Sequence, residues 1–261
     1  MPLKGGIENM HLIVAEDYDG MSRTAADCFC SMADSRQRRN AAVTAGSTPI
    51  GMYGYLVEYI RERDVLGYVH FYNFDEIPYR GEERDGITME SLKKYFYEPA
   101  CIPEARIHTL TDKNYQTYDK LVACDGGLDL CVLGIGRDGH FCSNTPGKTK
   151  WGNQTVKLPV YPHDRERIAH LMFGGNVSQV PDFLITMGPR SIMASRQLLL
   201  LASGKEKAEA IRALIATDIV DESIPSTILK LHPSLTVIAD RDALSLISAE
   251  VVEEMQWNGR G

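Results

Sequence analysis

Short apolar runs alternate with amphipathic stretches along the whole chain of 261 residues. The apolar, β-branched runs predict strands at residues 11–15, 41–44, 69–74, 129–133, 183–187, 198–202 and 235–239. Apolar positions at helical spacing predict helices at residues 18–34, 50–63, 88–97, 115–124, 205–216 and 242–255. Several strand runs are continuously apolar, as expected for a parallel sheet covered on both faces. The pattern therefore predicts an α/β fold, a three-layer αβα sandwich with a mainly parallel, Rossmann-like central sheet.

The least regular stretch is 151–175, which is rich in Gly, Pro and His and is expected to be an insertion or lid. The chain shows no low-complexity linker and no internal repeat. We therefore expect residues 1–261 to form a single domain.

Composition narrows the classes of partner. The chain has 28 Lys and Arg against 35 Asp and Glu, a net charge of −7, which argues against nucleic acid but not against a small anion. The six cysteines form no C-x-x-C pair and no zinc spacing, so we expect no metal and a reducing, cytoplasmic location. The longest aliphatic run, 198–202, is too short to span a bilayer, so no membrane partner is expected.

Ligands of open parallel sheets bind at the carboxyl ends of the strands, so the segments that follow the predicted strands are the candidates for function. The first is Gly46, Ser47 and Thr48, followed by Pro49 at the start of a predicted helix. Small residues, two hydroxyls and free backbone N–H groups favour a phosphate or carboxylate. The alternative is an ordinary small-residue turn that caps the helix.

The second segment places Asp75 and Glu76 at the end of an aromatic strand. Burial of a carboxyl there would raise its pKa and suit it to move a proton. The alternative is an acidic helix cap, or a carboxylate paired with Arg80 or Arg84.

The third segment contains Gly134, Gly136 and Gly139, which satisfy G-x-G-x-x-G after a predicted strand. Residues 141–147 make a poor helix start, and Lys157 stands where a dinucleotide site needs an acid. A nicotinamide site is thus disfavoured and no cofactor is expected. A glycine turn that presents Asp138 and His140, with the carboxylate orienting the imidazole, fits better.

The fourth segment begins the helix predicted after the strand 198–202. There Lys207 or Lys205 can reach a nearby anion, although a solvated pair of lysines is the alternative. Cations in a first helical turn oppose the helix dipole, which weakly favours a role.

In order and spacing, these segments resemble the glucosamine-6-phosphate isomerase/deaminase family, which is related to the 6-phosphogluconolactonases. The resemblance covers nearly the whole chain. It is carried by Gly46-Ser47-Thr48-Pro49, Asn73-Phe74-Asp75-Glu76, Gly136-Arg137-Asp138-Gly139-His140, Asn176-Val177-Ser178-Gln179-Val180-Pro181 and Leu229-Lys230-Leu231-His232-Pro233.

The resemblance implies a role for each matched residue. Asp75 would move a proton between C1 and C2 of an open-chain amino sugar phosphate. His140 would assist opening of the pyranose ring, with Asp138 holding the imidazole. Gly46, Ser47, Thr48 and Lys207 would bind the phosphate of this small-molecule partner. Members of the family often form homo-oligomers, but the sequence does not decide the oligomeric state here.

Two departures suggest a divergent branch of the family. Thr145 stands where the deaminases have a glutamate that completes the histidine relay. The deaminases also have an arginine that clamps the phosphate, and the corresponding position here falls near His170 and Leu171. Arg165, Arg167 or His170 are candidate substitutes for it.

Three functions therefore stay open. An isomerase/deaminase acting on glucosamine 6-phosphate or a close analogue fits the motifs best. A lactonase is the second, because a lactone is attacked as a ring and needs no ring-opening relay at Thr145. Against it, Ile77 occupies the position after the D-E pair where lactonases commonly have arginine. The third is a sugar-phosphate sensor that binds without turnover.

Overall fold

The computed structural model describes residues 10–63 and 65–256. Its central sheet has seven strands, and all of its paired neighbours run parallel. In order across the sheet the strands are β1 (Met10–Ala15), β10 (Leu235–Asp240), β9 (Gln197–Ala202), β6 (Leu130–Gly134), β2 (Arg39–Val43), β3 (Val69–Asn73) and β5 (Ile107–His108). The mainly parallel sheet predicted from the sequence is confirmed. That the whole chain forms one domain stays a prediction.

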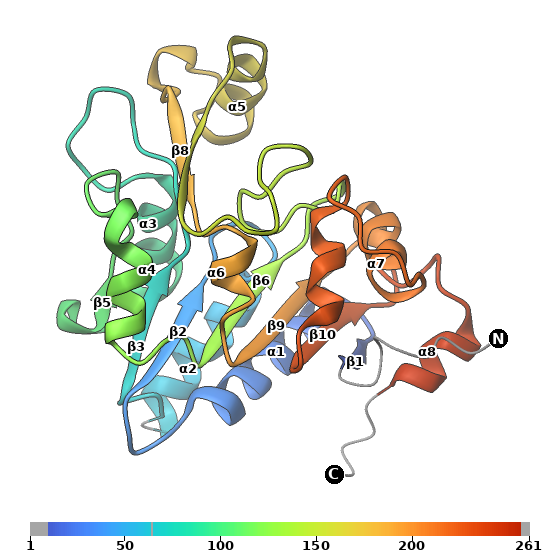
Figure 1. The fold of residues 1–261 in the computed structure, drawn as a ribbon. Coiled ribbons are helices and arrows are strands. Elements are labelled where there is room, and N and C mark those ends of the chain that lie inside the picture. The colour runs from blue at the N-terminus through green and yellow to red at the C-terminus, as the bar shows by residue number, and fades with distance from the viewer. Residues whose placement is uncertain (1–9, 64, 257–261) are drawn as a thin grey trace.

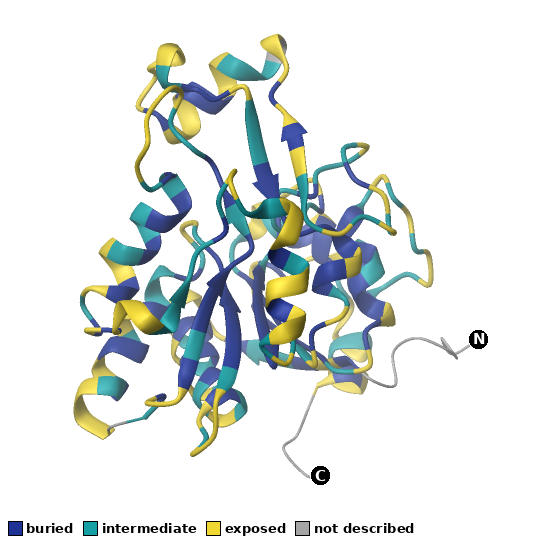
Figure 2. Ribbon diagram, turned by 60° about the vertical axis from the view of Figure 1, so that its left-hand side comes forward, coloured by how far each residue is buried: buried dark blue, intermediate teal, exposed yellow. Residues whose placement is uncertain are grey.

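Helices cover both faces of this sheet (Figure 1). They are α1 (Tyr18–Ala33), α2 (Ile50–Arg63), α3 (Ile87–Leu92), α4 (Tyr115–Cys124), α6 (Pro189–Ile192), α7 (Ala208–Ile215) and α8 (Ala249–Met255), whereas α5 (Arg165–Met172) lies above the sheet. Side chains of α1, α2 and α3 share one apolar core with one face of the sheet, and those of α4, α6, α7 and α8 share a second core with the other face. The result is the predicted three-layer sandwich, with buried central strands and helices exposed on their outer sides (Figure 2).

Shorter helical turns connect these elements. The π-helix η1 (Lys93–Tyr97) continues α3, and the 3-10 turns are η2 (Glu104–Arg106), η3 (Pro162–Asp164), η4 (Val177–Gln179), η5 (Lys205–Lys207) and η6 (Pro225–Leu231). No helix among the described residues is long and apolar enough to cross a membrane.

A second, antiparallel sheet rises with α5 above the carboxyl ends of the central strands (Figure 1). It consists of β4 (Asp75–Glu76), β8 (Phe183–Thr186) and β7 (Val156–Pro159), in that order. The strand predicted at 183–187 is thus present but lies outside the parallel sheet, because it pairs antiparallel with β4 and β7. The expected irregular stretch 151–175 contributes β7 and α5 to this upper part.

The helix predicted at 242–255 is shorter than expected. The carboxylate of Asp240 accepts a hydrogen bond from the backbone N–H of Ala243 (2.8 Å), which holds the chain in turns directly after β10. The helix begins only after Ser248, whose hydroxyl accepts from the N–H of Val251. Local side-chain caps therefore override the helical spacing of the apolar residues.

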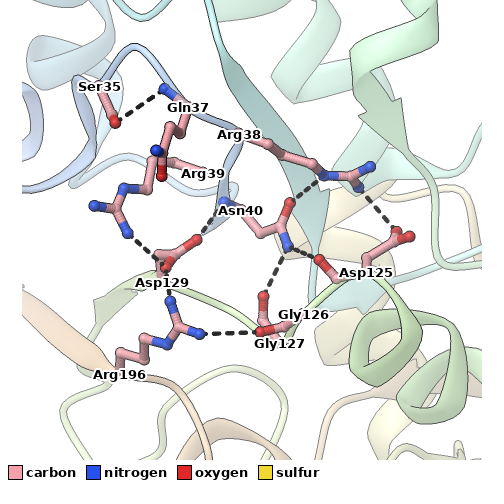
Figure 3. Close-up of polar contacts among 10 residues, drawn as sticks. All are labelled: Ser35, Gln37, Arg38, Arg39, Asn40, Asp125, Gly126, Gly127, Asp129 and Arg196. Atoms are coloured by element: carbon pink, nitrogen blue, oxygen red, sulfur yellow. Dashed lines mark hydrogen bonds and ion pairs between the residues drawn. The ribbon is translucent and has the colours of Figure 1, made fainter.

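Ion pairs connect the amino ends of the neighbouring central strands β9, β6 and β2. Asp129, just before β6, accepts hydrogen bonds from Arg39 of β2 (3.1 Å), from Arg196 next to β9 (2.5 Å) and from the backbone N–H of Asn40 (2.8 Å). These side chains converge on one carboxylate (Figure 3). Arg38 beside them pairs with Asp125 at 3.0 Å. The charged groups of this amino-end cluster are therefore engaged with one another.

Candidate active site

Asp75 lies on the two-residue strand β4, directly after the central strand β3. Its carboxylate accepts a hydrogen bond from the backbone N–H of Ser143 at 3.0 Å. Thr186 faces it in register on β8. Burial raises the pKa of Asp75 to about 6, although hydrogen bonds from Thr186 and Ser143 act in the opposite direction. The carboxyl group therefore changes its protonation state close to neutral pH, as a group that exchanges protons must.

Glu76 points away from Asp75 and has a different task, because neighbours along a strand face opposite sides. Its carboxylate accepts from the backbone N–H groups of Ile77 (2.8 Å), Thr88 (3.1 Å) and Met89 (3.3 Å), and so caps helix α3. Burial raises the pKa of Glu76 to about 7. The interpretation of this carboxylate pair as an acidic helix cap is thus right for Glu76 but not for Asp75.

The alternative, an ion pair of these carboxylates with Arg80 or Arg84, is not formed, and Arg80 lies 3.6 Å from Asp182. Arg84 binds Glu82 and Glu90 instead, at 2.6 and 2.5 Å. A cavity of about 650 Å³ is lined by Glu76, by residues 78–86 and by parts of the segments 109–113 and 181–183, but not by Asp75. We therefore place the candidate site on the Asp75 side of β4.

The glycine turn after β6 brings Asp138 against His140. Oδ1 of Asp138 lies 2.5 Å from Nδ1 of His140, and the two side chains are 46% and 40% exposed, so a ligand can reach the imidazole. Burial alone would raise the pKa of Asp138, but the charge and hydrogen bonds of His140 lower it below the ordinary value. A Cβ at Gly136 would lie 2.1 Å from His140 Nδ1, so a side chain there would displace the ring. No helix opens here: residues 135–150 form turns and an isolated bridge, unlike a dinucleotide-binding segment.

One short segment links the histidine turn to Asp75. Between His140 and Ser143, the backbone of Cys142 has φ 51°, a left-handed conformation that costs a non-glycine residue about 1 kcal/mol. This bend directs the N–H of Ser143 at the Asp75 carboxylate. The turn that holds the imidazole therefore also holds the carboxyl group of Asp75.

The small-residue loop 44–49 follows β2, and its Gly46 adopts φ 120°. Two tyrosines hold its backbone: Tyr18 donates to the carbonyl of Ser47 (3.0 Å), and Tyr53 donates to the carbonyl of Thr44 (2.5 Å). Among the described residues, the hydroxyls of Ser47 and Thr48 have no hydrogen-bond partner and stay available to a ligand. Neither tyrosine was predicted from the sequence, because Tyr18 is 29 residues from Ser47 and Tyr53, on the following helix, belongs to no motif.

The two lysines after β9 differ in their surroundings. Lys205 lies 3.9 Å from Asp242, whereas the ammonium group of Lys207 has no ion-pair partner in the described part of the chain. Asp240 holds the turn before them by accepting from the hydroxyl of Ser203 and the N–H of Gly204. Lys207, not Lys205, is therefore the lysine left open to an anion.

The strand order assembles these segments. Strands β9, β6, β2 and β3 are consecutive neighbours in the sheet, and parallel strands end at the same edge. The lysine segment, the histidine turn, the loop 44–49 and Asp75 therefore follow one another along the carboxyl edge of the sheet.

Two of the candidate substitutes for a clamping arginine are engaged elsewhere. Arg165 donates to the carbonyl of Val180 and pairs with Asp182, and Arg167 pairs with Asp164 at 3.0 Å. His170 lies exposed on α5, in the upper part of the molecule.

The late motif around His232 is structural. The imidazole of His232 is buried between the carbonyl of Ser195 (2.9 Å) and the N–H of Ser234 (3.0 Å). The ammonium group of Lys230 donates to backbone carbonyls at the end of α7 and beyond, including Thr217 at 2.7 Å and Ile219 at 2.9 Å. These residues support the fold without reaching the candidate site.

The fold defines the class: the chain is a Rossmann-like α/β protein whose candidate site lies at the carboxyl edge of a parallel sheet. It belongs to the family of glucosamine-6-phosphate isomerases and 6-phosphogluconolactonases, whose family model matches residues 16–237.

Relatives agree with this assignment. The chain is 32% identical over 246 residues to a glucosamine-6-phosphate deaminase of Oceanobacillus iheyensis, covering 92% of this chain and 97% of the relative. It is 34% identical over 248 residues to a glucosamine-6-phosphate deaminase of a Geobacillus species, with 92% and 97% coverage.

Solved structures show the same fold. A monomeric glucosamine-6-phosphate deaminase superposes with a TM-score of 0.80 at 28% identity, covering 91% of this chain and all of that one. The 6-phosphogluconolactonase of Trypanosoma brucei superposes with a TM-score of 0.69 at 17% identity, covering 91% and 98%, and shares the fold alone.

Proposed function

We propose that this chain is a sugar-phosphate isomerase/deaminase that converts glucosamine 6-phosphate, or a close analogue, to a ketose phosphate with release of ammonia. The observation that carries the proposal is Asp75, a carboxyl group whose pKa of about 6 suits proton exchange at neutral pH. It is held by the same turn that presents His140. The names of the relatives support the same activity.

The first step is opening of the sugar ring, which needs a proton moved between the C1 hydroxyl and the ring oxygen. His140 is proposed for this step, since an imidazole can take and give a proton. Asp138 holds Nδ1 of the ring, which leaves Nε2 to face the substrate.

The second step moves hydrogen from C2 to C1 of the open chain. In the proposal, ionised Asp75 takes the proton from C2. The C1 carbonyl oxygen takes a proton from the neighbouring C2 ammonium group of the substrate, so that C1 carries the hydroxyl and C2 the amine of an enolamine. Protonated Asp75 then gives the proton to C1, which leaves a C=N bond at C2. Water adds to C2, ammonia leaves, and the product is fructose 6-phosphate.

The phosphate of the substrate is assigned to the backbone and hydroxyls of Gly46, Ser47 and Thr48 together with the ammonium group of Lys207. The loop opens helix α2, whose first N–H groups add positive potential. Anchoring by Tyr18 and Tyr53 preorganises the loop before the ligand arrives. A phosphate held at this edge fixes the distance of C1 and C2 from Asp75.

A 6-phosphogluconolactonase-like hydrolase is the second candidate, and Thr145 is the observation that favours it. A threonine cannot supply the negative charge of a relay glutamate, and lactone hydrolysis needs no opening of a pyranose. His140 would then activate water against the ester carbonyl, with Asp138 holding its Nδ1.

One pair of assays separates the candidates. Purified protein is given glucosamine 6-phosphate with ammonia as the readout, and 6-phosphogluconolactone with acid release as the readout. The proposal expects ammonia together with fructose 6-phosphate. Acid release without ammonia would replace it with the lactonase. Sugar-phosphate binding with neither product would indicate a sensor.

A further inference from the structure

Arg137 stands at the tip of the histidine turn. The N–H of Gly139 donates to the carbonyl of Gly136 at 2.9 Å, which closes a four-residue turn with Arg137 as its second residue. The side chain of Arg137 is exposed and forms no hydrogen bond or ion pair with the residues that the structure describes. The structure therefore shows no contact through which the charge of Arg137 would stabilise the fold.

The neighbouring carboxylate does not neutralise it. Asp138 is the next residue, but its Oδ1 lies against both Nδ1 and the backbone N–H of His140, at 2.5 and 3.2 Å. The positive charge of Arg137 therefore remains available to a ligand.

The order of the strands gives Arg137 a central place. Strand β6 lies between β9 and β2, with Gly134 of β6 paired to Leu201 of β9 and Cys131 paired to Ala42 of β2. The turn that follows β6 therefore rises between the segment of Lys207 and the loop 44–49. These are the two halves of the phosphate site assigned above.

We propose that Arg137 is a phosphate-binding residue of this site, an inference that rests on the proposed function. A phosphate monoester carries a charge of about −2 near pH 7, which the single charge of Lys207 leaves half balanced. Lys207 and Arg137 together match it. The guanidinium group also offers a planar pair of donors that fits two phosphate oxygens, which an ammonium group cannot do.

The chemistry makes this chain selective for phosphorylated sugars. Arg165 and Arg167 are engaged with acidic partners in the upper part of the molecule, so the turn supplies the guanidinium instead. The same turn carries His140. Binding of the phosphate by Arg137 would therefore help to position the imidazole near C1 and the ring oxygen of the same substrate.

The test is calorimetric titration of fructose 6-phosphate and of inorganic phosphate into the wild-type protein and three variants. Arg137→Ala is expected to weaken both ligands about tenfold to a hundredfold, as for loss of one charge-assisted bidentate contact. Arg137→Lys keeps the positive charge but lacks the planar pair of guanidinium donors. Its affinity for both ligands is expected to lie between those of the wild-type protein and Arg137→Ala. The matched control is Arg36→Ala. Arg36 is also exposed and has no ion-pair partner among the described residues, but it precedes β2 at the opposite edge of the sheet.

Unchanged affinity in a folded Arg137→Ala protein would overturn the inference, and so would an equal loss in Arg36→Ala. Thermal melting of each variant establishes that it is folded. The proposed reaction fails separately, when the wild-type protein binds fructose 6-phosphate through Arg137 yet releases no ammonia from glucosamine 6-phosphate. Absence of sugar-phosphate binding by the wild-type protein would overturn both.

Discussion

The two ends of the central sheet use charged residues in opposite ways. At the amino end, Asp129 binds Arg39 and Arg196, and the groups in Figure 3 satisfy one another. At the carboxyl end, Arg137 and Lys207 have no ion-pair partner among the described residues, and burial holds the pKa of Asp75 at about 6. Charges that satisfy one another stabilise a fold, whereas charges kept available at one edge indicate where a ligand is handled.

At the carboxyl end, the adjacent carboxyl groups of Asp75 and Glu76 also differ in their contacts. Burial raises the pKa of both Asp75 and Glu76, to about 6 and about 7. Only the contacts tell them apart, because Glu76 is used up in capping α3 while Asp75 faces the histidine turn. A raised pKa alone therefore does not distinguish a candidate catalytic carboxyl group from a structural one in this molecule.

The largest effect is expected from Asp75→Asn. The amide cannot accept a proton from C2, so the rate of ammonia release should fall about a thousandfold or more. The fold should persist, because the substitution removes a partly buried charge and keeps the shape of the side chain. Glu76→Gln is the matched control. For both variants, steady-state kinetics measures the rate of ammonia release and thermal melting shows whether the protein is folded. A loss of rate in Glu76→Gln as large as in Asp75→Asn would contradict the division of roles.

At the amino end, Asp129→Ala should lower the free energy of unfolding by about 2–4 kcal/mol, since it leaves two guanidinium groups and a buried N–H without their acceptor. The rate per folded molecule should stay unchanged. Urea denaturation measures the free energy of unfolding. The rate of ammonia release, divided by the concentration of folded protein, gives the rate per folded molecule. The control Arg196→Ala, which removes an exposed partner, should cost less than about 1 kcal/mol. Strong loss of rate in folded Asp129→Ala protein would refute the separation of the two ends.

Asp138→Asn should slow ammonia release about tenfold to a hundredfold, because the imidazole loses the carboxylate that holds its Nδ1. If ring opening is the affected step, an open-chain form that cannot cyclise, because hydrogen replaces its C4 and C5 hydroxyls, should lose less rate than the cyclic form. Stopped-flow measurements with the two forms check this. Equal losses for both would assign Asp138 to a later step.

The smallest effect is expected from Thr186→Val. Removal of the hydroxyl takes away a hydrogen bond that favours ionised Asp75, so the pKa of Asp75 should rise further. Because Asp75 must be ionised to accept a proton, the acidic limb of the rate profile should move to higher pH by roughly half a unit to one unit. Kinetics across pH detect the shift. A limb that stays in place would separate Thr186 from the tuning of Asp75.

Much of the sheet and of the candidate site could be predicted from local sequence. Continuous apolar runs predicted the parallel sheet, and small residues after a strand marked the loop at Gly46. Spacing alone placed Asp138 two residues before His140, close enough to meet in a glycine turn. These features depend on neighbours within a few residues.

The remainder depends on contacts between distant segments. Nothing local distinguishes Asp75 from Glu76, because their roles follow from Ser143 and from the start of α3. The pairing of β8 with β4 and β7 could not be read from its apolar run, which suits either sheet. The central place of the histidine turn follows from the order β9, β6, β2, which sequence order does not specify.

The pH dependence of kcat/KM for ammonia release from glucosamine 6-phosphate tests the central claim most directly. The proposal predicts a rate that rises with pH as Asp75 ionises, with a midpoint near the pKa of about 6. It predicts that this limb moves with Thr186→Val and disappears with the activity in Asp75→Asn. A profile that stays flat from about pH 4.5 to pH 8, or ammonia release that survives Asp75→Asn, would contradict it.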